Sequence, residues 1–197
     1  MSGYGTSPGA GDLGGAGCLL LSGFSGGPEE MWPLAGALER RGALVRAPLI
    51  FPEWPWYAWL DAARVAYSQL ANETGCAWVV GVSLGALLAL RIAEEYPVDR
   101  LALVSPPRSP RDIRAALAAE GVGRYPDAGL RKLHRVVQRD LFAVTADALI
   151  GGAPGERGLR PLVSGMASAR VELAPLPRDA DALAGELCAR FIEGDAS

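Results

Sequence analysis

Short apolar runs alternate along the chain with longer segments in which apolar residues recur at helical spacing. This alternation predicts strands joined by helices, and therefore a parallel sheet covered by helices on both faces. The runs at 18–21, 77–80 and 101–104 are continuously apolar, which indicates strands in the middle of the sheet. We expect six strands, near 18–22, 43–47, 77–81, 100–105, 146–151 and 169–173.

The segments with helical spacing predict helices as well as their ends. Pro28, Glu29 and Glu30 suit a first turn, because proline needs no donor there and acids favour the helix dipole. A later helix should end before Pro97, which cannot continue it. The predicted helices span about 28–41, 58–73, 84–96, 109–120, 127–141, 159–166 and 180–193.

The length of 197 residues suits one domain. Residues 1–16 contain six glycines without an apolar period, so we expect a flexible tail there and a single domain over 17–197. Nineteen basic and 22 acidic residues give a net charge of -3, which offers no electrostatic surface for nucleic acid or an anionic membrane. The apolar runs are too short to span a bilayer and no signal pattern is visible, so we expect a cytoplasmic protein.

Three cysteines, Cys18, Cys76 and Cys188, lack the paired spacing of a zinc site or a disulfide framework. We therefore interpret them as buried free thiols. The sequence predicts neither a metal site nor a cofactor.

One five-residue motif gives the clearest indication of a catalytic residue. Gly81-Val82-Ser83-Leu84-Gly85 lies between a predicted buried strand and a predicted helix. A serine at such a turn is raised above the sheet, and the two glycines leave room for the tight backbone and the close helix. The motif alone is weak in a chain with 25 glycines, and a plain turn with a capping serine is the alternative. Its place between strand and helix favours Ser83 as a nucleophile.

Acyl transfer also needs N–H groups that stabilise a developing oxyanion. Leu84, the residue after the nucleophile, supplies one of them. The second should come from the glycine-rich turn 22–27 that follows the first strand, where Phe24 is the first candidate and Ser25 the second. The alternative is that this segment is only a glycine turn before a helix.

Five segments of the chain resemble bacterial carboxylesterases and monoacylglycerol lipases of the α/β-hydrolase superfamily. They are LLLSGFSGGPEEM at 19–31, VRAP at 45–48, WYAWL at 56–60, GVSLG at 81–85 and ALVS at 102–105. The resemblance covers residues 17–105 well. The remainder resembles the family only in the alternation of its predicted strands and helices. The resemblance implies an α/β-hydrolase fold of about six mostly parallel strands with helices on both faces. It also places Ser83 where the strand order reverses, and implies a small helical cap, for which 106–141 is the candidate.

The resemblance further implies an acid after the next-to-last strand and a histidine after the last one, because the serine needs a base and the base an orienting partner. Residues 174–181, after the last predicted strand, contain no histidine and offer Asp179 and Asp181. Asp179 is a poor base unless burial raises its pKa. The loop after strand 146–151 has no aspartate, which leaves Glu156 as the candidate acid.

His134 is the one histidine of the chain. On a cap helix it would hang over Ser83 as a relocated base. A solvated or half-buried surface histidine is the alternative. A third possibility is that a partner subunit, or the second protomer of a homodimer, supplies the base.

Candidate substrate contacts flank these residues. Ser22 stands where the family commonly has a histidine before glycine. Five aromatic residues follow the second predicted strand, and they either line an acyl pocket or pack into the core or a lid: Phe51, Trp54, Trp56, Tyr57 and Trp59. We name Ser22, Trp54 and Trp56 as candidate substrate-binding residues.

Two functions remain open from the sequence. The first is a serine carboxylesterase or thioesterase that acts on a small ester through Ser83. The second is a catalytically inactive hydrolase-fold protein that binds a small-molecule acyl ligand or a partner, because the expected histidine is missing. A flavodoxin-like or nucleotide-binding sheet is a weaker alternative for the fold, since residues 22–27 lack a phosphate-loop pattern.

Overall fold

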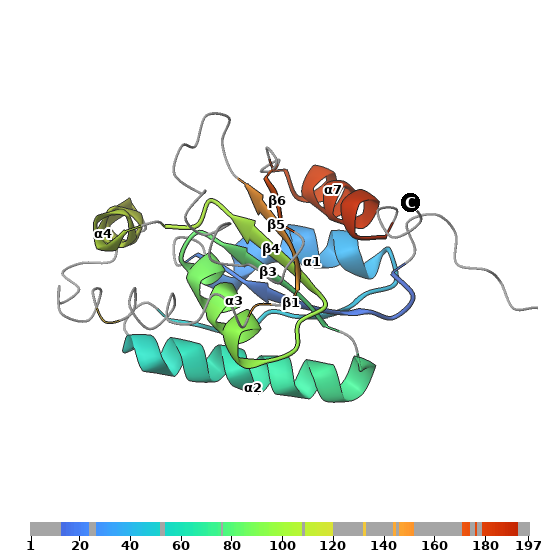
Figure 1. The fold of residues 1–197 in the computed structure, drawn as a ribbon, viewed down its shortest axis with the longest axis horizontal. Helices are drawn as coiled ribbons and strands as arrows, with labels where there is room; N and C mark the ends of the chain where they lie inside the picture. Colours follow the sequence, from blue (N-terminus) through green and yellow to red (C-terminus); the bar gives the residue numbers. More distant parts are fainter. Residues whose placement is uncertain are drawn as a thin grey trace, which may run out of the picture.

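Six parallel strands form the centre of the fold, in the order β2-β1-β3-β4-β5-β6 (Figure 1). They are β1 (Gly17–Leu21), β2 (Leu44–Arg46), β3 (Ala77–Val82), β4 (Arg100–Val104), β5 (Asp147–Gly151) and β6 (Val171–Leu173). The six predicted strands are confirmed. This computed structural model describes residues 13–23, 27–51, 54–75, 77–107, 109–119, 132, 144, 146–151, 171–173, 176 and 179–192.

The strand order reverses between β1 and β3. From β1 the chain crosses to β2 on one side, and then it returns past β1 to β3 and continues outward to β6. Leu21 at the end of β1 pairs with Gly81 near the end of β3, so the carboxyl ends of these two strands lie side by side. Connections that leave such a point in opposite directions open a crevice above it.

Helices cover both faces of the sheet, as the sequence predicts (Figure 1). On one face α1 (Trp32–Glu39) packs against α7 (Ala180–Ile192), and on the other α2 (Trp56–Thr74) packs against α3 (Leu84–Glu95). The helix α4 (Pro110–Ala119) follows β4. Ile113 and Leu117 of α4 are buried in the same core cluster as α2 and α3.

The strand β1 takes part in both halves of the core. Leu19 and Leu21 belong to the cluster formed with α2 and α3, whereas Cys18 and Leu20 belong to the cluster formed with α1 and α7. All four side chains are at most 1% exposed, which explains why the run is continuously apolar. Each fully buried leucine contributes about 1.5–3 kcal/mol relative to an exposed one.

The first helix begins later than predicted. A 3₁₀ helix, η1 (Gly27–Met31), occupies the predicted first turn, and α1 starts only at Trp32. Pro33 has no N–H to donate to the carbonyl of Glu29, so a continuous α-helix from 28 would lose that bond. The structure instead places Pro33 in the first turn of α1, where no donor is needed.

Residues 13–16, the last part of the predicted tail, make backbone hydrogen bonds to the start of the sheet. Leu13 is 6% exposed, and its N–H donates to the carbonyl of Arg41 at 2.6 Å. The Ala16 carbonyl accepts a bond from Leu44 at 3.0 Å, so this stretch is tied to the start of the sheet. Residues 1–12 lie outside the described residues, as do most of the predicted cap 106–141 beyond α4 and the predicted helix 159–166.

Candidate active site

Ser83 occupies a sharp turn between a strand and a helix. β3 ends at Val82 and α3 begins at Leu84. Ser83 itself has φ 52° and ψ -119°, and its side chain is partly exposed at the carboxyl edge of the sheet. A positive φ in a residue with a β-carbon costs about 1–3 kcal/mol and persists only where the surroundings impose it. The predicted strand-turn-helix context of Ser83 is therefore confirmed.

The two glycines of the motif are required by backbone contacts. A β-carbon on Gly81 would lie 2.5 Å from the Ala86 Cα and 2.5 Å from the Gly85 carbonyl oxygen. A β-carbon on Gly85 would lie 2.0 Å from the carbonyl oxygen of Leu21 and 2.5 Å from that of Ser22. The start of α3 thus packs directly on the ends of β1 and β3, which positions Ser83 between them.

Backbone hydrogen bonds hold the N–H and the carbonyl of Ser83, and the N–H of the next residue, Leu84, remains available as a donor. The Ser83 N–H donates to the carbonyl of Val104 at 2.9 Å, and the Ser83 carbonyl accepts from Ala86 at 3.1 Å. Within the described part of the chain, the Leu84 N–H has no acceptor. As a first-turn donor at the positive end of α3, it is suited to bind an anion.

Ser22 lies beside this turn. It directly follows β1, and it is 4% exposed. Because Leu21 pairs with Gly81, the residue after β1 comes next to the elbow of Ser83. Phe24, the predicted second oxyanion donor, lies outside the described residues.

The remaining predicted catalytic residues divide into two groups. His134 and Glu156 lie outside the described residues. Asp179 is exposed and caps α7: its Oδ1 accepts from the Ala182 N–H at 2.8 Å, and its carbonyl accepts from Leu183 at 2.8 Å. The structure thus gives Asp179 a helix-capping contact that was not predicted from the sequence.

One residue of the predicted cap contacts the aromatic segment. The Lys132 ammonium lies 5.9 Å from the centre of the Trp56 ring, within the range of a cation–π interaction. Trp56 also meets Tyr57 edge-on, with ring centres 6.0 Å apart. Lys132 therefore places part of the segment 106–141 against the first turn of α2.

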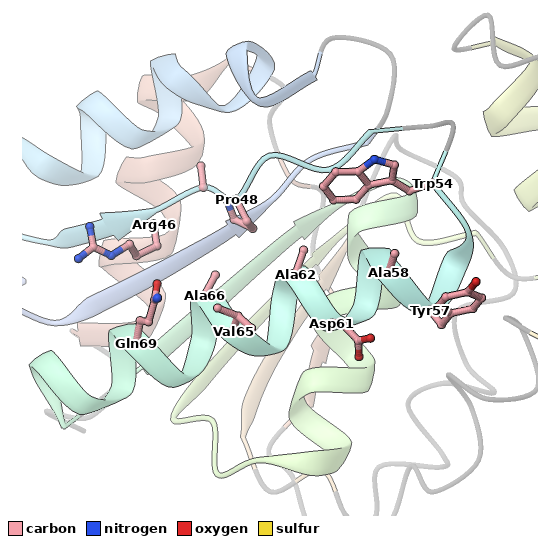
Figure 2. A pocket seen from close by; sticks show the side chains of 11 residues that line it. Arg46, Pro48, Trp54, Tyr57, Ala58, Asp61, Ala62, Val65, Ala66 and Gln69 are labelled. Carbon is pink, nitrogen blue, oxygen red and sulfur yellow. The ribbon is translucent and has the colours of Figure 1, made fainter.

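Trp54 lines an apolar groove of about 560 Å³ between the chain that follows β2 and the outer side of α2 (Figure 2). Trp54 and Tyr57 lie at one end of it, and Arg46 and Gln69 at the other. Its remaining lining residues are Ala47, Pro48, Ala58, Asp61, Ala62, Val65 and Ala66. Ser83 does not line this groove: Ser83 follows β3, whereas the groove begins at Arg46 of β2, and β1 lies between these two strands. The groove is thus a feature of the sheet edge and not the crevice above Ser83.

The charged residues of the groove are already paired. Arg46 donates to both carboxylate oxygens of Glu73 at 2.8 Å, and Asp61 accepts from Arg64 at 2.8 Å. Four large apolar side chains near the groove are exposed by between 37% and 56%: Leu49, Phe51, Trp54 and Tyr57. Phe51 meets Trp54 edge-on, with ring centres 5.1 Å apart, so it extends the apolar surface at the aromatic end of the groove.

From the sequence, Ser105 is only the end of a predicted strand. In the structure it has φ 50°, a left-handed conformation that is unusual for a residue with a β-carbon. The available signal was a Ser-Pro pair after a buried strand. This pair predicts the opposite backbone conformation, because a residue before proline is expected to be extended.

Two general properties follow from the described residues. No helix among them is both long enough and apolar enough to cross a membrane. Cys18 and Cys188 are buried free thiols, as predicted, while Cys76 lies outside the described residues. Burial raises the pKa of the Cys188 thiol.

Comparison with known proteins finds a lipase among the proteins that this chain resembles in sequence. The chain is similar to the thermostable monoacylglycerol lipase of Bacillus sp. (strain H-257), with 30% identity over 102 residues, 47% of this chain and 41% of that lipase. The match thus spans less than half the length of this curated relative. No protein-family model matches the chain.

Solved structures resemble most of the chain. A structure of the metagenome-derived lipolytic enzymes LipS and LipT superposes with a TM-score of 0.73 at 19% identity, over 92% of this chain and 96% of that one. Est1E from Butyrivibrio proteoclasticus gives 0.63 at 15% identity, over 93% and 89%. An esterase domain from a Rhodothermus marinus protein gives 0.62 at 21% identity, over 88% and 85%. At these identities the likeness establishes a shared fold.

Proposed function

We propose that this chain, which has the α/β-hydrolase fold, is a serine hydrolase that cleaves a small ester, as a carboxylesterase or a thioesterase. The observation that carries the proposal is the backbone of Ser83, which is held at φ 52° and ψ -119° between β3 and α3. Such strain is maintained where a side chain must project from a fixed turn. The lipases and esterases that share the fold and part of the sequence support the same reaction class.

The reaction divides into two acyl transfers. The Ser83 hydroxyl oxygen attacks the ester carbonyl while a base takes its proton, and the resulting oxyanion is bound by the N–H groups of Leu84 and Phe24. Collapse of the tetrahedral intermediate expels the alcohol or thiol, which takes up the proton from the base. Water then attacks the acyl-enzyme by the same route, and releases the acid and free Ser83.

His134 is the proposed base, and Glu156 the acid that orients it. Support comes from Lys132, which is two positions from His134 and contacts Trp56 at the first turn of α2. Asp179 is the second candidate, although its exposed carboxylate already caps α7.

The proposed ligand is a small ester with an apolar acyl group. Ser22 contributes a hydroxyl at the end of β1, beside the elbow of Ser83. Trp54 and Trp56, near the start of α2, are the proposed apolar contacts of the acyl group, and residues 106–141 are the proposed cap. Trp54 lines the groove at the sheet edge, so its part in the proposal requires an acyl group that extends from Ser83 to that groove. An apolar surface with few polar groups binds the acyl part and leaves the carbonyl to the N–H donors.

We also propose a cytoplasmic location and a homodimer. The buried free thiols of Cys18 and Cys188 suit a reducing compartment. The exposed apolar side chains Leu49, Phe51 and Tyr57 suit a contact between two copies. Sedimentation of the purified protein at several concentrations tests the dimer, which a monomer at all of them would exclude.

The test of the function combines a reactive probe with an assay. A fluorophosphonate probe should label the wild type and Ser68→Ala, a control at an exposed serine of α2, but not Ser83→Ala. Hydrolysis of short-chain nitrophenyl esters should fall by about 10²–10⁴ in His134→Ala, as expected for loss of a general base. Labelling of Ser83→Ala at the wild-type rate would exclude the serine mechanism. A folded wild type that neither labels nor hydrolyses would instead support an inactive binding protein.

A further inference from the structure

Two strained serines lie side by side at the carboxyl edge of the sheet. Among the described residues, Ser83 with φ 52° and Ser105 with φ 50° are the two non-glycine positions with positive φ. Each follows the last residue of a strand, and those last residues, Val82 of β3 and Val104 of β4, are register partners. The two unusual turns are therefore neighbours across one pair of strands.

A hydrogen bond connects the two turns. The Ser83 N–H donates to the carbonyl oxygen of Val104 at 2.9 Å. That carbonyl belongs to the planar peptide group that joins Val104 to Ser105. The orientation of the acceptor for Ser83 is therefore coupled to the φ angle of Ser105.

The chain beyond Ser105 is anchored, so this φ angle cannot change freely. Pro106 and Pro107 are both buried. They lead into α4, where Ile113 is 0% and Leu117 is 2% exposed within the core. With the strand fixed on one side and this segment on the other, rotation at Ser105 would turn the Val104 carbonyl away from Ser83.

The strain at Ser105 has no explanation in its local sequence. A residue before proline prefers an extended backbone, and a β-carbon disfavours the left-handed one. A conformation that is unfavourable on both counts persists when surrounding contacts demand it, and such residues cluster at functional sites. The Val104 carbonyl, which accepts from the Ser83 amide beside the Val82–Val104 pair of the ladder, directly adjoins this conformation.

We propose that Ser105 is a positioning residue for Ser83: its left-handed turn aims the Val104 carbonyl at the Ser83 amide and so holds the nucleophile in its strained conformation. This inference rests on the proposed function of Ser83 as a nucleophile. It assigns the role to the backbone of Ser105 and not to its hydroxyl. The side chain at 105 matters through its tolerance of positive φ.

A substitution series separates these two possibilities. Asn tolerates the left-handed region and lacks the hydroxyl, so Ser105→Asn should label with a fluorophosphonate at close to the wild-type rate. Val is β-branched and opposes positive φ, so Ser105→Val should label about tenfold more slowly or worse. Ser105→Ala should fall between them. Ser68→Val, at an exposed position of α2, is the control for a serine-to-valine change.

A second measurement does not depend on reactivity. The hydrogen exchange of the Ser83 amide, followed by NMR, reports the bond to Val104 directly. Protection should be retained in Ser105→Asn and reduced in Ser105→Val, with the melting temperature and circular dichroism showing that each variant is folded. If Ser105→Val does not fold, Ser105→Ala carries the same comparison, and wild-type labelling together with wild-type protection in it would overturn the inference.

The remaining outcomes are also decisive. Equal losses of labelling in Ser105→Asn and Ser105→Val, with an unchanged Ser83 amide, would assign the role to the hydroxyl and overturn the inference. A wild type that is not labelled would end the proposed function. Reduced protection of the Ser83 amide in Ser105→Val would then still support the coupling of the two turns, and unchanged protection would overturn it.

Discussion

The carbonyl oxygen of Leu21 lies so close to Gly85 that a β-carbon added to Gly85 would be 2.0 Å from it. Leu21 ends β1 and Gly85 lies in the first turn of α3, so this approach sets how closely the helix behind Ser83 meets the central strands. The opposing atom belongs to the backbone. No side-chain rotation can therefore make room for the added β-carbon.

Gly85→Ala should therefore damage both stability and the site. We expect the free energy of unfolding in urea to fall by about 3 kcal/mol, at the upper end of overpacking effects, because strand or helix backbone must move. We also expect the Gly85→Ala variant to lose the labelling of Ser83 by a fluorophosphonate. The matched control is Gly36→Ala in α1, where the new β-carbon would meet only the end of the Arg40 side chain, at 3.5 Å.

Gly36→Ala should stabilise the protein by roughly 0.5–1 kcal/mol, as expected for this change inside a helix. A Gly85→Ala variant with wild-type stability and labelling would show that the elbow is not built on close backbone packing.

Asp179 can be tested as a cap and as a base in one experiment. Asp179→Ala should lower the free energy of unfolding by about 0.5–2 kcal/mol, because the Ala182 N–H loses its acceptor, whereas Asp179→Ser should retain most of it. Both variants should hydrolyse nitrophenyl esters at close to the wild-type rate. Loss of hydrolysis in a stable Asp179→Ser variant would instead identify Asp179 as the base.

Glu95 should make stability dependent on pH. Its carboxylate accepts from Arg64 of α2 at 2.6 Å and contacts Arg91 at 2.6 Å, and the hydrogen bond from Arg64 is the main cause that holds the pKa of Glu95 below its usual 4.5. A lowered pKa means that this stabilisation is complete above pH 4.5 and is lost as the pH falls through the pKa of the folded state.

Glu95→Gln should therefore cost about 1–2 kcal/mol at pH 7, and the difference from the wild type should shrink below pH 4.5. Urea denaturation across this pH range measures it. The control is Glu186→Gln, which removes an ion pair with Arg190 within α7 and should cost at most about 0.5 kcal/mol. A difference for Glu95→Gln that is the same at every pH would contradict the assignment.

Trp59 should hold the aromatic end of the groove in place. It is 1% exposed, and its indole N–H donates to the Phe51 carbonyl at 2.8 Å, which also accepts from the Trp54 N–H at 3.0 Å. Trp59→Phe should lower the free energy of unfolding by about 1–3 kcal/mol and speed hydrogen exchange at the Trp54 amide. Tyr57→Phe, at a ring that is 56% exposed, should change neither measurement.

The sheet and the elbow could be predicted because both depend on local pattern. Runs such as 18–21 are apolar throughout because both faces of the strand are covered, and this shows directly in the sequence. Gly81 and Gly85 flank Ser83 because two nearby backbones leave no room for a β-carbon, so the requirement is also visible as a short motif.

Other features depend on contacts between distant segments. Ser105 stands between the Val104 carbonyl, which accepts from the Ser83 N–H, and the buried Pro106 and Pro107, and no local rule combines these surroundings into a positive φ. The capping role of Asp179 depends on where α7 starts. A base on a different element, such as His134, requires knowledge of tertiary placement that residue spacing alone does not contain.

The burial of β1 on both faces also bears on how the molecule melts. Removal of α1 and α7 would expose Cys18 and Leu20 to water, while removal of α2 and α3 would expose Leu19 and Leu21. Loss of either helical layer would expose apolar side chains of β1, the strand against which the other layer also packs. We therefore expect denaturation to proceed as one cooperative step. A fragment truncated before Ala180 should for the same reason fail to keep a native sheet.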